Sequence, residues 1–222
     1  MKKFLIVPFL FLLTMQFAYA SYDVQFNKRG WDKYSELVVK VAEQTPDVEP
    51  LEMTVLLSME SNFGKYTVNK RNRSVGGIYQ FTDGTWREMI KETGKKHGIK
   101  RGTPKSNDLA NVKMTAELIR KNKRILRKYL KREDISIEEV YMAHLIGVYG
   151  AAKILSANDN TLAARLVRPR GNKGYFYHKG KARTVKQFKE NLRRKVQGHA
   201  SVYRDDVYAL MTSDSPYEVA MR

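Results

Sequence analysis

Apolar residues recur with the spacing of an α-helix through most of this chain of 222 residues. Between residues 108 and 130 they follow one helical face, with lysines and arginines on the other: Val112, Ala116, Ile119, Leu126 and Leu130. The same spacing defines one face of an earlier helix: Trp31, Tyr34, Leu37, Val38, Val41 and Ala42. A period near 3.6 predicts amphipathic helices. We therefore expect a mostly α-helical domain.

Residues 64–81 interrupt the helical pattern. The segment is rich in glycine and polar residues, with β-branched and aromatic residues between them, which predicts a loop or short hairpin. Before it, Glu49-Pro50 begins a helix that ends near Asn62, since proline is favoured in a first helical turn. After it, a helix is expected from Thr82 to Lys96. The fold class is thus helical with a short irregular or β segment.

Two capping boxes mark further helix starts in the second half of the chain. Ser136 with Glu139 opens one apolar helix, which we expect to break at Gly147 or Gly150. Thr184 with Gln187 opens another. Between these helices, residues 168–183 form a basic, aromatic loop. Beyond residue 198 no helical period is evident.

The first twenty residues predict export. Lys2 and Lys3 precede an apolar run of about fourteen residues, and Ala18-Tyr19-Ala20 resembles a cleavage site, so 1–20 is interpreted as a signal peptide. A retained membrane anchor is the alternative, although a spanning helix needs about twenty apolar residues. We expect a periplasmic or secreted protein with a domain over 21–198 and a tail over 199–222. The chain has no cysteine, so packing alone must stabilise it.

The formal charge is +18, and removal of Lys2 and Lys3 leaves +16 (18 − 2) on the mature chain. Such a charge favours an anionic partner, here a cell-wall or envelope surface. A basic face that only keeps the protein soluble is the alternative. Nucleic acid is not an expected partner of an exported chain without an interleaved aromatic and basic motif. We expect a monomer with no metal and no other cofactor.

Glu60 stands in an apolar run, LLSMESNFGKY, at the end of the second expected helix. Burial there and the negative end of the helix dipole both disfavour the charged carboxylate and raise its pKa. A carboxyl group that stays protonated near neutral pH suits a general acid. The alternative is an ordinary carboxylate paired with Lys65, Lys70 or Arg73.

Several segments resemble the lytic transglycosylase family with the soluble-lytic-transglycosylase domain, and its bacteriophage-associated branch in particular. They are ESNF, GGIYQFTDGTW, AHLIGVYGAAKIL and NKGYFYHKGKARTV, at 60–63, 76–86, 143–155 and 172–185. The resemblance implies a lysozyme-like helical fold that acts on peptidoglycan glycan strands. It also implies cleavage of the β-1,4 bond between N-acetylmuramic acid and N-acetylglucosamine, with Glu60 as the catalytic acid.

The sequence is compatible with chemistry that uses one carboxyl group. Most glycosidases use two, but no Asp or Glu lies between Ser61 and Thr82. This absence agrees with the product that the resemblance implies, 1,6-anhydro-N-acetylmuramic acid, which forms without water. Asp83, Glu88 and Asp108 remain candidates for a second acid that approaches in space.

The resemblance also suggests substrate-binding residues. Gln80 would bind sugar substituents, Gly76 and Gly77 would admit the glycan close to the backbone, and Ser74 would contact an N-acetyl group. Tyr79 is expected to stack on a sugar, but Tyr79, Phe81 and Trp86 are equally compatible with the core.

Other expected contacts lie beside the acid and across the site from it. Ser61 is interpreted either as a residue that orients the acid or as a helix-terminus hydroxyl. The family often has A-Y-N-A-G where this chain has AHLIG, so His144 is expected in the place of the tyrosine, unless it is a buried core residue. Tyr141, Asn172 and Tyr175 are weaker candidates.

Three rival functions share these features in part. A goose-type lysozyme would use water and release a reducing muramic end. A wall protein that has lost catalysis would bind sacculi without cleaving them. An exported nucleic-acid binder would show salt-dependent affinity that is indifferent to Glu60.

Overall fold

A computed structural model describes residues 24–68, 74–169 and 171–212; the expected signal peptide lies outside these ranges. The helices of the described part are α1 (Lys28–Glu43), α2 (Pro50–Ser61), α3 (Asp83–Thr93), a 3-10 turn (Gly94–His97), α4 (Asp108–Leu130), α5 (Ile137–Ile146), α6 (Val148–Leu155), α7 (Ala163–Leu166), α8 (Lys173–Phe176) and α9 (Val185–Thr212). Two antiparallel pairs of two-residue strands accompany them: β1 (Val75–Gly76) with β2 (Phe81–Thr82), and β3 (Tyr177–His178) with β4 (Lys181–Ala182). The expected mostly helical fold with a short β segment is confirmed.

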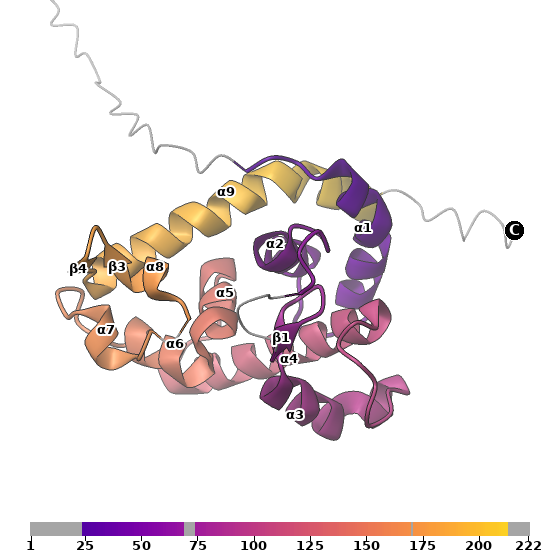
Figure 1. Cartoon of the computed structure of the whole chain (residues 1–222), viewed down its shortest axis with the longest axis horizontal. Coiled ribbons are helices and arrows are strands. Elements are labelled where there is room, and N and C mark those ends of the chain that lie inside the picture. Colours follow the sequence, from indigo (N-terminus) through magenta and orange to yellow (C-terminus); the bar gives the residue numbers. More distant parts are fainter. Residues whose placement is uncertain (1–23, 69–73, 170, 213–222) are drawn as a thin grey trace, which may run out of the picture.

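Helix α2 lies at the centre of the molecule. Figure 1 shows it nearly end-on, with α9 along one side and α1 and α5 flanking it, and these three helices contact it. Its apolar residues are buried on several sides instead of along one stripe, including Met53, Val55, Leu56 and Leu57. A helix that is apolar all round must be buried, so the residues near its end are held within a packed surrounding.

Local signals define both ends of α2. Pro50 occupies the first turn, and Glu49 and Glu52 form a capping box that the sequence analysis did not identify. Asn62 follows the last turn in the left-handed conformation, with φ of 49°. The helix therefore ends at Ser61, one residue after Glu60.

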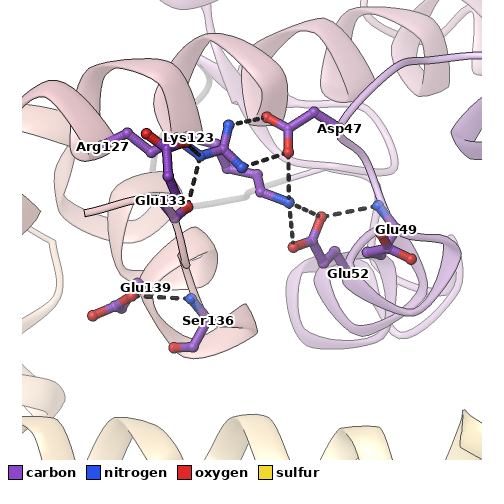
Figure 2. A network of polar contacts seen from close by, with 8 residues as sticks. All are labelled: Asp47, Glu49, Glu52, Lys123, Arg127, Glu133, Ser136 and Glu139. Atoms are coloured by element: carbon purple, nitrogen blue, oxygen red, sulfur yellow. Dashed lines mark hydrogen bonds and ion pairs between the residues drawn. The ribbon is translucent and has the colours of Figure 1, made fainter.

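Buried charges join α2 to α4 (Figure 2). The ammonium group of Lys123 lies 3.0 Å from one carboxylate oxygen of Glu52 and 3.4 Å from Asp47, and the side chains of Lys123 and Glu52 are each 6% exposed. Arg127, one helical turn further along α4, forms a second ion pair with Asp47. The pairing compensates two charges that would be costly to bury alone.

A break between α5 and α6 changes the direction of the chain at Gly147. This residue has φ of 78° and ψ of 149°, a conformation that residues with a Cβ rarely adopt. The expected break is confirmed at Gly147; Gly150 lies inside α6. Both expected capping boxes are present, at Ser136 with Glu139 and at Thr184 with Gln187.

The sequence analysis placed the end of the domain at residue 198, but α9 extends beyond it. The helix continues through Gly198 to Thr212, and one face of it stays buried as far as Val207: Leu192, Val196, Ala200, Tyr203 and Val207. The Tyr203 ring lies 4.7 Å from that of Phe63 and 5.6 Å from that of Trp31, between centroids. Residues 199–212 are therefore part of a helix that packs on the core through Ala200, Tyr203 and Val207, and do not form a separate tail. Of the expected tail, 213–222 lies outside the described residues.

In the described ranges, no helix combines the length and the apolar character needed to cross a bilayer.

Candidate active site

Glu60 lies in the last turn of α2 with its side chain 17% exposed. Burial raises the pKa of its carboxyl group, while the charge of His144 and the hydroxyl of Tyr141 act in the opposite direction. The group is thus largely removed from water and still reachable from solvent. A carboxyl group in such a position can exchange a proton with a bound molecule.

His144 faces Glu60 from the last turn of α5. Its Nε2 atom lies 3.7 Å from Oε1 of Glu60, and its side chain is 10% exposed. The sequence analysis left open whether His144 faces the acid or is satisfied elsewhere in the core. The structure places it against the acid.

Tyr141, one turn earlier on α5, is the second neighbour of Glu60. Its side chain is buried, and burial and then the Glu60 charge raise the pKa of its hydroxyl well above the ordinary value. The hydroxyl groups of Tyr141 and Tyr175 share a hydrogen bond of 3.1 Å. Tyr175 comes from α8, so a hydrogen bond to Tyr141 links α8 to the residues beside Glu60.

In the described residues, no lysine or arginine forms an ion pair with Glu60. Lys65, one of the expected pairing partners, instead has its Nζ 5.4 Å from the ring centroid of Tyr66. The other two, Lys70 and Arg73, lie outside the described residues. The one ion-pair contact of Glu60 in this part of the chain is with His144.

Three carboxylates remained as candidates for a second acid, and lysines bind all of them. Asp83 lies 2.5 Å from Lys105, and Glu88 lies 2.6 Å from Lys121. Asp108 accepts hydrogen bonds of 3.0 and 3.4 Å from Tyr34 and Lys33. Among the described residues, no carboxylate contributes to the pKa shift of Glu60.

The expectation that Tyr79 stacks on a sugar is wrong. The residue is fully buried: its backbone N–H donates to Oδ1 of Asn111 at 2.9 Å, and its hydroxyl donates to the carbonyl of Met53 at 3.1 Å. Phe81 and Trp86 are core residues as well. An isolated motif does not reveal which face of a short β turn is covered, and here α4 and α2 cover it.

Of the two interpretations of Ser61, the structure favours the hydroxyl that caps a helix end. The residue is not a substrate contact. It is 1% exposed, and its Oγ accepts a hydrogen bond of 2.9 Å from the N–H of Gly64. This bond satisfies a backbone group just beyond α2. Ser61 therefore supports the turn after Glu60 without facing the solvent.

The requirement for glycine at Gly77 has a structural cause. Its φ is 78°, and a Cβ there would lie 2.4 Å from Nδ2 of Asn111. Close packing against α4 thus explains the residue, and the expected approach of the glycan is not needed. Gly76 lies in β1, where a Cβ would meet nothing closer than 3.6 Å.

Gln80 and Ser74 lie in the β1–β2 region, partly exposed. The side-chain amide of Gln80 donates to the carbonyls of Gly77 at 2.8 Å and Tyr66 at 3.2 Å. The carbonyl of Ser74 accepts a hydrogen bond of 2.6 Å from Lys105. These bonds order the loop; roles of Gln80 and Ser74 in sugar binding stay predictions.

Asn172 acts on the backbone beside His144. Its side-chain amide donates to the carbonyl of Leu145 at 2.9 Å, close to the break at Gly147. A helix end leaves carbonyl groups without partners, and Asn172 satisfies one of them. It therefore helps to fix the end of α5 that carries His144.

The sequence analysis missed a contact between α2 and α9. Ser58 Oγ and Nδ1 of His199 form a hydrogen bond of 2.7 Å, two residues before the acid. Burial, and then the charge of Lys195, lower the pKa of His199 to about 4. The residue is neutral at physiological pH and joins α9 to the helix that carries Glu60.

A scan against models of known protein families found no match to this chain. In the described part of the chain, no three His, Asp or Glu side chains are arranged to hold a metal ion.

Proposed function

We propose that the protein is a peptidoglycan lytic transglycosylase in which Glu60 acts alone as general acid and then as general base. The observation that carries the proposal is the state of this carboxyl group: mostly buried, with a raised pKa, reachable from solvent, and without a lysine or arginine partner in the described residues. The ESNF, GGIYQFTDGTW and AHLIGVYGAAKIL segments resemble that family, which supports the assignment of peptidoglycan as the substrate.

In the first step, Glu60 donates its proton to the oxygen between N-acetylmuramic acid and N-acetylglucosamine. The bond from C1 of the muramic residue to this oxygen breaks, and the N-acetyl oxygen of the same sugar stabilises the electron-deficient carbon. In the second step, the Glu60 carboxylate takes the proton of the C6 hydroxyl, and O6 bonds to C1. The acid ends protonated as it began, and no water is consumed.

His144 and Tyr141 suit the state of Glu60 between the two steps. Both interactions favour the carboxylate over the protonated acid, in opposition to burial. Burial thus keeps the proton available for the first step, and the two neighbours stabilise the charge that the first step creates. A general acid that must become a base needs this intermediate balance.

Two features support the route through one carboxyl group. The segment after the acid contains no Asp or Glu up to residue 82, and lysines bind Asp83, Glu88 and Asp108. Either mechanism with two carboxylates would need a second carboxyl group of the protein within about 10 Å of the first, beside the scissile bond. In the proposed route the substrate takes over the role of this second carboxylate: its N-acetyl group stabilises C1, and its C6 hydroxyl is the nucleophile.

The test is Glu60→Gln assayed on purified sacculi, with product masses determined. Cleavage should fall about 100- to 10,000-fold, the usual contribution of general acid–base catalysis. Glu36→Gln, a matched change at an exposed glutamate of α1, should leave cleavage unchanged.

The wild-type products should end in 1,6-anhydro-N-acetylmuramic acid. Reducing muramic ends would instead indicate a hydrolase of the goose-type lysozyme kind. Sacculus binding without any cleavage by the wild type would indicate a wall-binding protein. A Glu60→Gln variant that retains wild-type cleavage would refute the role of the acid.

A further inference from the structure

A hollow of about 550 Å³ lies between the β3–β4 hairpin and α9. We call it the basic groove; the residues of its lining that matter here are His178, Lys181, Arg183, Glu190, Arg193 and Arg194. Figure 1 shows the hairpin beside the start of α9, at the end of the molecule away from α1. The groove thus holds four lysine or arginine side chains and one carboxylate. Its size is that of a binding site for a small molecule or a short chain.

Two cations of the basic groove have no carboxylate partner among the described residues. The side chains of Lys181 and Arg194 form no hydrogen bond or ion pair with any described residue. The Glu190 carboxylate forms no ion pair with a described residue either. Some cations outside the groove do have a carboxylate partner. Lys189, the neighbour of Glu190 on α9, lies 2.6 Å from Asp159, and Arg127 is paired with Asp47. What distinguishes the groove is that four basic side chains line one hollow, and two of them, Lys181 and Arg194, have no carboxylate partner among the described residues.

Arg183 is fixed in this groove beside a like charge. Its Nη1 donates to the carbonyls of Gly174, Tyr175 and Tyr177 at 2.8, 3.0 and 2.8 Å. Burial, and then the charge of Arg194, lower the pKa of Arg183. Like charges held close together in a partly desolvated groove oppose folding, and a bound anion would relieve both effects.

The basic groove is connected to the candidate active site through α8. Arg183 bonds the carbonyl of Tyr175, and the hydroxyl of Tyr175 bonds Tyr141, which lies against Glu60. One tyrosine side chain thus separates the groove from the residues around the acid. A polymer that is bound at Glu60 and carries flexible anionic branches can place a branch in the groove.

We propose that the basic groove binds the carboxylates of the peptide stems that a peptidoglycan strand carries while the strand lies at Glu60. The inference rests on the proposed function. An extended stem of four residues reaches roughly 13–14 Å from its sugar. Guanidinium groups bind carboxylates with two parallel hydrogen bonds, which suits a groove with arginines at its wall. The groove would thus favour strands that still carry their peptides.

The experiment measures binding in the Glu60→Gln background, so that no cleavage occurs. The double variant Lys181→Ala/Arg194→Ala is compared with Lys100→Ala/Arg101→Ala, which removes the same two charges from exposed positions elsewhere. Each protein is titrated with intact sacculi and with glycan strands whose peptides an amidase has removed.

The groove variant should bind intact sacculi about tenfold more weakly, as expected for two charge-assisted contacts at a partly exposed site. It should bind the stripped strands within about twofold of its parent, and the control variant should match its parent on both. Equal losses on both substrates, no loss on either, or no measurable binding of intact sacculi would overturn the proposal. So would a duplex DNA that displaces intact sacculi from the groove.

The two proposals fail separately. Suppose that the wild type does not cleave glycan, but the groove variant loses binding to intact sacculi and not to stripped strands. The catalytic proposal is then wrong, and the proposal that the groove binds peptide stems is retained. If the wild type cleaves and the groove variant binds both substrates normally, the groove proposal falls and the catalytic proposal stands.

Discussion

The two ends of α2 each carry a glutamate whose pKa burial raises, Glu52 near the first turn and Glu60 in the last. Glu52 is 4% exposed and accepts hydrogen bonds from the backbone N–H of Glu49 at 3.0 Å and from Lys123 at 3.0 Å (Figure 2). Glu60 faces His144 at 3.7 Å and is in contact with solvent. Both carboxyl groups have a raised pKa. They differ in their access to solvent and in the side chains that lie beside them.

The comparison teaches what separates a structural carboxyl group from a candidate acid. Glu52 cannot meet a substrate, and its contacts with Lys123 join two helices of the core. Glu60 lies at the negative end of the same helix dipole, which offers the carboxylate no support. Its neighbours are the imidazole of His144 and the hydroxyl of Tyr141 instead of a fixed ammonium group. Substitutions at each end of α2 test this difference.

The largest expected effect on stability is at the Glu52 end. Lys123→Met leaves Glu52 and Asp47 without their shared ammonium group, and removal of one partner of a buried ion pair costs about 3–5 kcal/mol of unfolding free energy. The loss should shrink as the pH falls, because protonation of Glu52 removes the unpaired charge. Chemical denaturation at several pH values measures it.

Lys121→Met is the matched control, two residues earlier on α4. Its partners Glu88 and Glu92 are largely exposed, and such pairs contribute about 1 kcal/mol or less. If Lys123→Met costs no more than Lys121→Met, the buried pair is not the structural device described here.

A smaller effect of opposite sign is expected at the Glu60 end. A carboxyl group with a raised folded pKa contributes stability that is complete below its unfolded pKa and is lost as the pH rises through its folded pKa. Glutamine does not titrate, so Glu60→Gln should unfold at higher temperature than the wild type near pH 8. A gain on the order of 1 kcal/mol corresponds to a few degrees.

The gain should vanish near pH 3, where the wild-type carboxyl group is protonated in both states. Thermal melts of the two proteins across this pH range provide the measurement. A Glu60→Gln variant that is less stable than the wild type at pH 8 would mean that the carboxylate, not the acid, is the favoured form in the fold.

Sequence patterns predicted the elements with local causes. Helix α4 has the predicted bounds, 108–130, because its apolar stripe is long and Asn107 caps its start. The breaks and starts at Gly147, Ser136 and Thr184 also follow from nearby residues. Such features depend on contacts within one or two turns, which a sequence displays directly.

Features that depend on distant contacts were not predictable in the same way. The burial of Tyr79 is set by Asn111 and Met53, each more than twenty residues away. The extension of α9 was missed because Gly198 and the small Ala200 weaken an apolar stripe that packing against Phe63 and Trp31 completes at Tyr203. Of the site, Glu60 and His144 came from the sequence, whereas the roles of Ser61 and Asn172 came from the fold.

The most direct measurement is the titration of the Glu60 carboxyl group by carbon-13 NMR, assigned by its absence in Glu60→Gln. The midpoint should lie above the value of about 4.3 for an unperturbed glutamate, and kcat/KM for glycan cleavage should fall at that same pH as the proton is lost. In His144→Phe the midpoint should rise further, since an opposing charge is removed. A Glu60 midpoint at or below 4.3, or cleavage whose pH dependence ignores it, would contradict the account.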